Sequence, residues 1–270
     1  MQIIERAEWA DMARAEFKSQ EALAAIIPDN VVVPMAWGYF QDDTSKSFYL
    51  SRFRNMSAQT PPPSQLVDIL SKLHQESTSP TGKFGFHCAT YWGPPRIVNA
   101  WTDNWEEFWS RQFRSDIAYA QRIYGEDEEL ATLTEEFIQK AVARLPTDRL
   151  SYSTHAPSMG MPKVCSYVGL LDEWKWCFQI MAYFTNFNNN AKSVDFQAIG
   201  EPRYALRMNV VDIYKEKVGA SEPRDDFYDR HFLYGIRNDV VVAAICPEWE
   251  SLLVTQVHKQ LSHPAAEVHA

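Results

Sequence analysis

The densest group of side chains that could do chemistry lies near the C-terminal end of the chain. Asp225, Asp226 and Asp229 are followed directly by Arg230 and His231. Grouped carboxylates beside an arginine could bind a cation or exchange a proton with a substrate. The same residues are typical of a helix start, because the helix dipole favours acidic side chains there. We favour this structural interpretation of the group.

Other catalytic patterns are incomplete. Ser158-Met159-Gly160 does not match the nucleophile elbow of hydrolases, and the sequence has no G-x-x-x-x-G-K-[ST] phosphate loop. His87 and His155 could meet in space, but single histidines are usually structural, so we expect no metal site. The four cysteines are far apart and form no C-x-x-C pair, which argues against a zinc knuckle or a disulfide framework. Free thiols in a reducing compartment are expected.

Composition narrows the class of protein. The 270 residues include 26 basic and 35 acidic side chains, a formal net charge of −9. An acidic chain without a basic cluster is a poor candidate for binding nucleic acid or an anionic membrane. The start of the chain has no apolar signal region, and the longest apolar run, residues 240–246, is too short to span a bilayer. We therefore expect a cytoplasmic protein with neither partner.

The elements that must position any site are mainly helical. Residues 31–40 and 47–53 are expected to be strands, whereas seven segments are expected to be helical: 5–27, 66–74, 104–117, 128–145, 204–218, 225–245 and 249–261. Between the two kinds of structure, residues 57–64 form a proline-rich linker, SAQTPPPS. The prediction is a small α/β unit over residues 1–56 and a larger, mainly helical unit over residues 57–270.

The aromatic stretch from Gly82 to Arg114 contains four of the nine tryptophans. Its second half predicts a helix, because an apolar residue recurs every four positions and Asp103 and Asn104 are both suitable N-caps. Glycine, proline and aromatic residues dominate the first half, which we expect to be a loop.

This stretch also carries a resemblance. Its sequence FGFH, its T-Y-x-G turn and the segment N-x-W-T-D-x-W-E-E-F-W resemble the fructosamine (ketosamine) kinase family in its fungal form. Residues 34–38, 79–83 and 221–234 continue the resemblance in the same order along the chain. The resemblance implies an α+β, protein-kinase-like (aminoglycoside-phosphotransferase-like) fold. It places a truncated N-lobe at residues 1–56 and a mainly helical C-lobe at residues 57–270.

The resemblance also implies which parts a phosphotransferase needs. A glycine-rich hairpin and a lysine-bearing strand should precede the first N-lobe helix, and this chain starts at about that helix. Glu16 lies where we expect the glutamate that pairs with the lysine. Without that lysine, an exposed structural carboxylate is the favoured interpretation of Glu16.

Two further catalytic positions are altered. The family's H-G-D-L-W-x-G-N loop aligns best at residues 153–157, where His155 matches but Pro157 replaces the aspartate. Proline has no carboxylate to accept the proton of the acceptor hydroxyl. In the metal-binding strand, Gln179 replaces the aspartate, and a neutral amide is a weaker Mg²⁺ ligand than a carboxylate. These losses should remove useful catalysis.

Three interpretations remain open. The first is a degenerate family member, a pseudokinase that needs no cofactor and binds a small molecule or a partner, with recruitment to a fungal metabolite pathway as one such role. The second is a true ATP- and Mg²⁺-dependent ketosamine 3-kinase whose gene model is incomplete here. The third is a structural interaction module. The gene sequence around residues 1 and 150–200 would separate the first two.

A ligand site, if present, is expected in the cleft between the lobes. Candidate pocket residues are Tyr91, Asn99, Trp101 and Asp103, with Asp229 and Arg230 from the C-lobe. Aromatic rings with a few polar groups suit a sugar-like or amine-bearing ligand. The competing interpretation is that the rings pack the loop onto the lobe. We also expect self-association, or a partner, across an uncovered sheet edge at residues 31–39 and 47–53.

Overall fold

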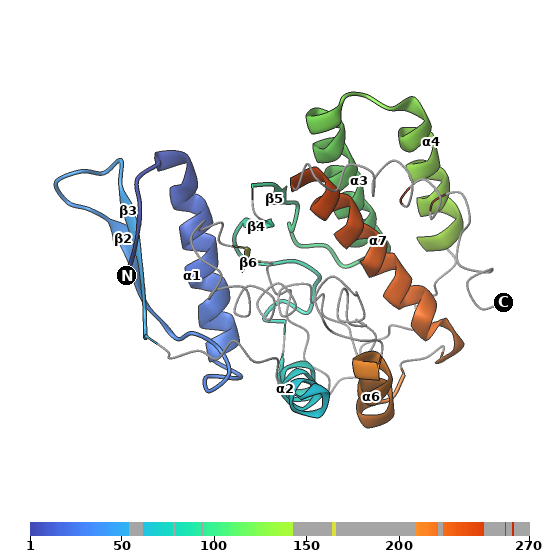
Figure 1. Ribbon diagram of the computed structural model, residues 1–270, viewed down its shortest axis with the longest axis horizontal. Coiled ribbons are helices and arrows are strands. Elements are labelled where there is room, and N and C mark those ends of the chain that lie inside the picture. Colours follow the sequence, from blue (N-terminus) through green and yellow to red (C-terminus); the bar gives the residue numbers. More distant parts are fainter. Residues whose placement is uncertain are drawn as a thin grey trace.

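A computed structural model gives the fold (Figure 1) and describes residues 1–53, 62–77, 79–92, 94–142, 164–165, 209–220 and 224–245, with residues 257 and 261. The α-helices are α1 (Ala10–Ala24), α2 (Pro63–Glu76), α3 (Trp105–Tyr124), α4 (Glu128–Phe137), α6 (Asn209–Val218) and α7 (Phe227–Ile245). The strands are β1 (Gln2–Ile4), β2 (Pro34–Tyr39), β3 (Ser47–Ser51), β4 (Thr90–Trp92), β5 (Arg96–Ile97) and β6 (Val164–Cys165). Short 3₁₀ turns precede α1 and α7, at Ala7–Trp9 and Arg224–Asp226.

The N-terminal layer, which we define as β1, β2, β3 and α1, is a three-stranded antiparallel sheet with one helix against it. The strand order is β1-β3-β2. Ile4, Ala13 and Tyr49 form its small buried core. The predicted helix and both predicted strands are confirmed. The sequence analysis missed β1, because three residues are too few to show an alternating pattern and this strand exists through its pairing with β3.

Helix α1 joins this layer to the rest of the molecule. Ala13 packs beneath the sheet, whereas Leu23, near the other end of the helix, lies in the main hydrophobic core with Ile27. The helix also contacts β4 and β6, so it lies between the sheet and the remainder of the chain (Figure 1).

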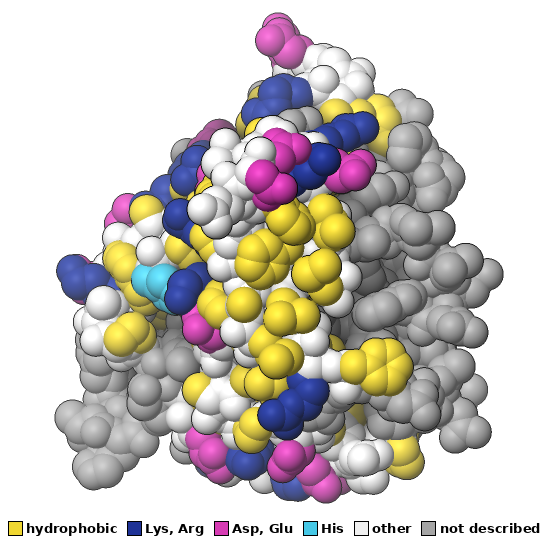
Figure 2. Space-filling view, turned by 90° about the vertical axis from the view of Figure 1, so that its left-hand side faces the viewer, with side chains coloured by type: hydrophobic (Ala, Val, Ile, Leu, Met, Phe, Trp, Pro, Cys, Tyr) yellow, Lys and Arg dark blue, Asp and Glu magenta, His cyan; other side chains and the backbone are white. Residues whose placement is uncertain are grey.

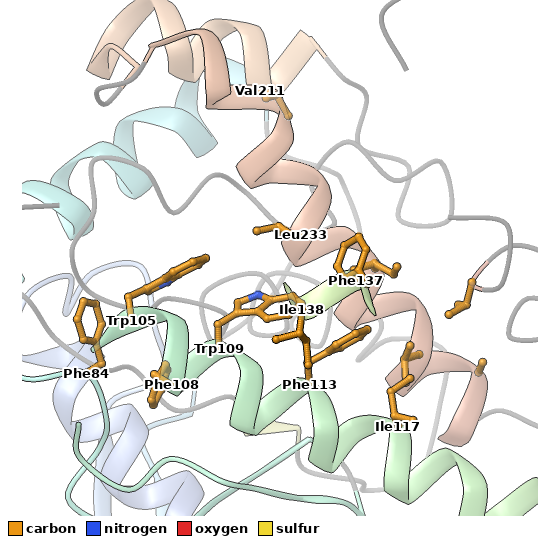
Figure 3. Close-up of a cluster of buried hydrophobic side chains, with 14 of the residues drawn as sticks. Phe84, Trp105, Phe108, Trp109, Phe113, Ile117, Phe137, Ile138, Val211 and Leu233 are labelled. Carbon is orange, nitrogen blue, oxygen red and sulfur yellow. The ribbon is translucent and has the colours of Figure 1, made fainter. Parts of the chain in front are cut away.

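The helical body, which we define as α2, α3, α4, α6 and α7, is organised by α3. The buried side chains of α3 follow the predicted stripe, and the Trp109 ring lies 4.8 Å from Phe113 and 6.3 Å from Phe137 (Figure 3). Both Trp109 and Phe113 are completely buried, and α3 packs along α7. Burial of such rings gives the largest apolar contribution of any side chains, so this cluster is the main source of the body's stability.

The start of α3 confirms one of the two predicted caps. The Asn104 side chain accepts a hydrogen bond from the backbone N–H of Glu107 at 2.9 Å. The Glu107 carboxylate does not complete a capping box; it accepts instead from the Thr102 hydroxyl at 2.7 Å. The helix runs seven residues beyond the predicted end, to Tyr124, and stops at Gly125, whose φ of 102° suits glycine.

The expected loop before α3 is partly a sheet, so that prediction was wrong. Strands β4 and β5 form a short antiparallel hairpin, and β6 adds to β4 in parallel. Phe84 forms an isolated bridge with Thr102. The glycines and prolines of this segment do form turns, as predicted. The turns connect very short strands, which exist through their pairing with other segments.

The later helices follow the prediction with different ends. Helix α4 passes into a π-helical turn at Ile138–Val142. The described part of α6 begins five residues after the expected start, and α7 begins two residues later than expected. Almost all of the predicted helix at 249–261 lies outside the described residues. Within the part of the chain that is described, none of the helices has the length and apolar character needed to cross a bilayer.

Candidate functional site

Among the predicted site residues, Glu16 differs most from its prediction in the structure. Its carboxylate belongs to the middle of α1, and the residue is only 5% exposed, so it is not the exposed helix carboxylate that we favoured. The pKa of Tyr49 is raised, chiefly by burial and further by the negative charge of Glu16. A buried carboxylate therefore lies near a phenol beneath the sheet.

The strand that precedes this helix is present as β1. Gln2 pairs with Tyr49 across the sheet, so the two side chains share one face, and Ile4 on the same face enters the small core. The sequences of the three strands, QII, PMAWGY and SFYLS, contain neither lysine nor arginine. On the face that it shares with Tyr49, β1 thus places the amide of Gln2 rather than the amine of a lysine.

Other polar groups of the sheet are also buried. The Tyr49 hydroxyl, the Ser47 hydroxyl and the Trp37 indole N–H have no hydrogen-bond partner in the described structure. Buried polar groups without partners cost stability and are often found where function constrains the residue. Within the described residues, the three strands of this layer offer hydroxyl, amide and indole groups but no lysine or arginine side chain to neutralise phosphate charge.

The hairpin brings Tyr91 and Asn99 into one small region. The amide nitrogen of Asn99 donates to the Cys88 carbonyl at 2.9 Å and to the Thr90 hydroxyl at 3.0 Å, and the residue is 9% exposed. Asn99 therefore braces the hairpin. Tyr91 is half-buried on β4, and burial raises the pKa of its phenol.

Trp101 and Asp103 lie at the other end of the same segment and make separate contacts. The half-buried Trp101 ring covers Gly85, where an added Cβ would come within 2.7 Å of the ring atom Cε3. Asp103 forms an exposed ion pair with Lys83 at 2.9 Å. Each of these contacts joins two residues of the same segment, which supports the interpretation that these side chains pack the loop.

The remaining candidates are placed only in part. Asp229 and Arg230 lie in the first turn of α7, beyond the described side chains, so no contact between them and the hairpin candidates is established. His155, Pro157 and Gln179 lie outside the described residues.

A buried polar network between α3 and α7 escaped the sequence analysis. The Arg237 guanidinium donates to Asp116 at 2.7 Å and to the amide oxygen of Gln112 at 2.5 Å. Arg237 and Asp116 are 3% and 6% exposed. The sequence does indicate that Gln112 and Asp116 lie on one side of α3, because each precedes a residue of the apolar stripe by one position.

Comparisons with known proteins agree with this architecture. The chain matches the family model described as fructosamine kinase over residues 3–153, which is more than half of its length. A crystal structure from Haemophilus somnus 129PT, assigned as a fructosamine-3-kinase, superimposes with a TM-score of 0.61 at 18% sequence identity. The superposition covers 97% of this chain and 82% of that one. No curated protein matches the chain. The fold is protein-kinase-like, and the chain belongs to the fructosamine kinase family.

Proposed function

We propose that this family member binds a small molecule without transferring phosphate to it. The observation that carries the proposal is the composition of the three strands in the N-terminal layer. No basic side chain lies on β1, β2 or β3, and the buried Glu16 carboxylate acts on the Tyr49 phenol rather than on an amine of the strands. Without that positive charge, the phosphates of a nucleotide lose one of their main electrostatic partners.

Two residues outside the described part support the same conclusion. Pro157 stands where the family resemblance places the catalytic aspartate, and Gln179 stands where it places a metal-binding aspartate. Losing the carboxylate that accepts the proton and weakening the Mg²⁺ ligand would each slow phosphoryl transfer. The protein would then need neither ATP nor Mg²⁺ as a cofactor.

The ligand is proposed to enter the cleft between the lobes. Tyr91 has a half-buried ring, and the Trp101 ring is also partly accessible, which supports this assignment. A sugar-like or amine-bearing molecule would match these rings, with Asp229 and Arg230 as further candidates on α7. Recruitment of this cleft to a fungal metabolite pathway, in the cytoplasm, is part of the same proposal. It involves neither nucleic acid nor a membrane surface.

Nucleotide binding tests the proposal. Thermal unfolding is recorded with ATP and Mg²⁺ at up to millimolar concentration, and we expect no change in Tm. A ligand that binds the folded state raises stability by RT ln(1 + [L]/Kd), so a nucleotide present at about 100 times its Kd would add roughly 2.7 kcal/mol. Mg²⁺ without ATP serves as the control. A rise of several degrees that needs both components would contradict the proposal and favour the ketosamine kinase interpretation.

Self-association is the second part of the proposal. Strand β3 lies between β1 and β2, so the predicted uncovered edge at residues 47–53 is wrong, and β1 and β2 are the edges of the described sheet. Ile3 on β1 and Met35 on β2 are 51% and 61% exposed. Figure 2 shows apolar side chains gathered on this side of the molecule. Unpaired strand edges and apolar patches both favour contact with another chain.

Sedimentation of two matched variants tests this contact. Ile3→Lys introduces a charge on the sheet, and Ile123→Lys does the same at a 48% exposed position on α3. We expect a concentration-dependent dimer that Ile3→Lys weakens and Ile123→Lys leaves unchanged. A monomer at all concentrations, or equal effects of the two substitutions, would contradict the proposed contact.

A further inference from the structure

The sheet of the N-terminal layer has its polar and apolar faces reversed. Ser47 and Tyr49 of β3 are buried on the side of α1, whereas Phe48 and Leu50 lie on the opposite side and are partly exposed. The exposed Ile3 of β1 shares this opposite side, because it pairs with Phe48. An antiparallel sheet that packs one face on a core normally turns its polar residues to solvent. The reversal predicts that another surface covers the apolar side.

The other residues on this side of the sheet are apolar as well. Ala36 and Gly38 of β2 pair with Leu50 and Phe48. The Phe40 ring packs edge-on against Phe48 at a centroid distance of 5.6 Å. We define these residues as the outer face: Ile3, Ala36, Gly38, Phe40, Phe48 and Leu50. Figure 2 looks onto this side of the molecule and shows apolar side chains gathered there. The outer face therefore has no charge that would oppose contact with an identical surface.

The charges beside the outer face lie at its two ends and differ in sign. In the turn between β2 and β3, Lys46 pairs with Asp43 at 3.2 Å, which leaves the exposed Asp42 carboxylate at this end. The exposed Arg52 directly follows β3 and lies at the other end. Among the described residues, neither Asp42 nor Arg52 has a side-chain hydrogen bond or ion pair. The outer face is thus an apolar surface between one free anion and one free cation.

A second copy of the chain matches this arrangement of charges. A two-fold axis that lies between two outer faces and runs across the strands places each β3 antiparallel to the other. If the axis passes at Tyr49, residue 52 of one copy lies over residue 46 of the other, at the end that carries Asp42. Each Arg52 then approaches an Asp42 carboxylate across the contact. An axis along the strands would instead bring the two Asp42 carboxylates together, which is unfavourable.

We propose that the protein forms a two-fold dimer in which the outer faces of two copies pack against each other. This inference rests on the self-association proposed above and assigns it to a face of the sheet rather than to a strand edge. Sheets stack about 10 Å apart, so Phe48 and Leu50 of both copies would interdigitate. Three strands of about five residues cover roughly 240 Å², whereas a stable interface takes about 800 Å² from each partner. A weak dimer is therefore expected.

Sedimentation equilibrium of two matched variants tests the assignment to this face. Phe48→Asp places a charge in the middle of the outer face. Tyr39→Asp places the same charge on the opposite face of the sheet, at a 49% exposed position paired with Ser47. We expect Phe48→Asp to weaken the dimer by at least about tenfold and Tyr39→Asp by less than about threefold. Thermal unfolding of both variants checks that each is folded. Pairing through an edge would tolerate Phe48→Asp, because β3 is the middle strand.

A charge exchange tests whether the partner is a second copy, with substitutions that leave the core unchanged. Arg52→Glu should weaken the dimer by about five- to tenfold, because it sets two carboxylates against each other. Adding Asp42→Arg should restore the affinity to within about twofold, since both pairs re-form with their signs exchanged.

Two kinds of result would overturn the outer-face dimer. A wild-type protein that stays monomeric at all concentrations would remove both this inference and the proposed self-association. A dimer that resists Phe48→Asp, or that the charge exchange does not restore, would remove the outer-face dimer alone and leave self-association in place.

Discussion

The N-terminal layer and the helical body place their polar and apolar side chains very differently. In the body, the buried Arg237 guanidinium bonds to Asp116 and Gln112, and a continuous aromatic cluster surrounds α3. In the layer, the core that the structure describes has three buried side chains. Among described residues, seven large apolar side chains are exposed, and six of these lie within residues 1–53: Met1, Ile3, Trp9, Met35, Tyr39 and Phe53.

This difference assigns distinct roles to the two regions. A body with a large core and a buried ion pair can supply most of the folding free energy. The layer has too little buried area to be stable alone and depends on α1, which reaches the main core through Leu23. Substitutions in the body should therefore report on global stability, whereas substitutions around the layer should report on binding and local electrostatics.

The largest expected effect comes from breaking the buried ion pair. Asp116→Ala leaves the Arg237 charge buried at 3% exposure without its carboxylate. The free energy of unfolding should fall by about 3–5 kcal/mol, measured by urea denaturation. Asp103→Ala, which removes the exposed partner of Lys83, is the matched control and should cost less than about 1 kcal/mol. Similar losses of unfolding free energy for the two variants would mean that the buried network stabilises the body no more than an exposed ion pair does.

The next effect distinguishes packing from ligand binding at Trp101. Trp101→Ala should cost about 2–3 kcal/mol, somewhat less than a fully buried aromatic residue, because the ring is half-buried over Gly85. Gly85→Ala should also be destabilising, because its φ is 147° and the new methyl group meets the ring.

A double-mutant cycle sharpens this prediction. Removing the ring relieves the two contacts with ring atoms but neither the contact with the Trp101 Cα at 2.8 Å nor the backbone strain. Gly85→Ala should therefore cost about 1 kcal/mol less when Trp101 is already alanine. Additive effects would show that the two residues are not in contact. A Trp101→Ala variant that keeps its melting temperature and loses ligand binding would instead assign this ring to a pocket.

A smaller effect is expected from pH at the boundary between the two regions. The pKa of His87 is lowered in the folded protein, so the unfolded chain takes up the proton first as pH falls. The contribution of His87 to the free energy of unfolding is therefore fully present above the ordinary pKa of 6.5. It falls as pH decreases through the pKa of the folded protein and is constant below that value. The test is the unfolding free energy between pH 8 and 5 in phosphate-free buffer. His87→Asn should flatten the profile, and an unchanged slope would contradict this assignment.

The smallest expected effect is at the surface of the body. Arg114 donates two hydrogen bonds to Glu135, each at 2.7 Å, and this contact lowers the pKa of the Glu135 carboxyl. Both side chains are about half exposed, so solvent screens the pair. Glu135→Gln should cost less than about 1 kcal/mol and less still in high salt. A loss as large as that of Asp116→Ala would remove the contrast between buried and exposed pairs.

Much of the fold could be predicted from the sequence where periodic patterns are long. The stripe through Trp105, Trp109 and Phe113 identified α3 and its core, because each helical turn repeats the same burial. The family motifs then supplied the fold, which the comparisons confirm. Strand β1 and the hairpin at Thr90–Ile97 were missed, since two or three residues carry no pattern and tertiary pairing alone makes them strands.

The candidate site was less predictable, because it depends on contacts between distant segments. Asn99 and Trp101 were identified by residue type, but only the structure shows that the amide braces Cys88 and that the ring covers Gly85. Glu16 was expected to be exposed; the sheet in front of α1 buries it.

Phosphoryl transfer itself tests the central claim most directly. The protein is incubated with Mg²⁺, a fructosamine and ATP labelled in its terminal phosphate, and label in the sugar product is measured beside a fructosamine kinase of established activity. We predict no transfer above the level of a sample without protein, because the family resemblance places Pro157 and Gln179 where two carboxylates are expected, and because β1, β2 and β3 contain no lysine or arginine. Mg²⁺-dependent labelling of the fructosamine that rises with protein concentration would contradict the account.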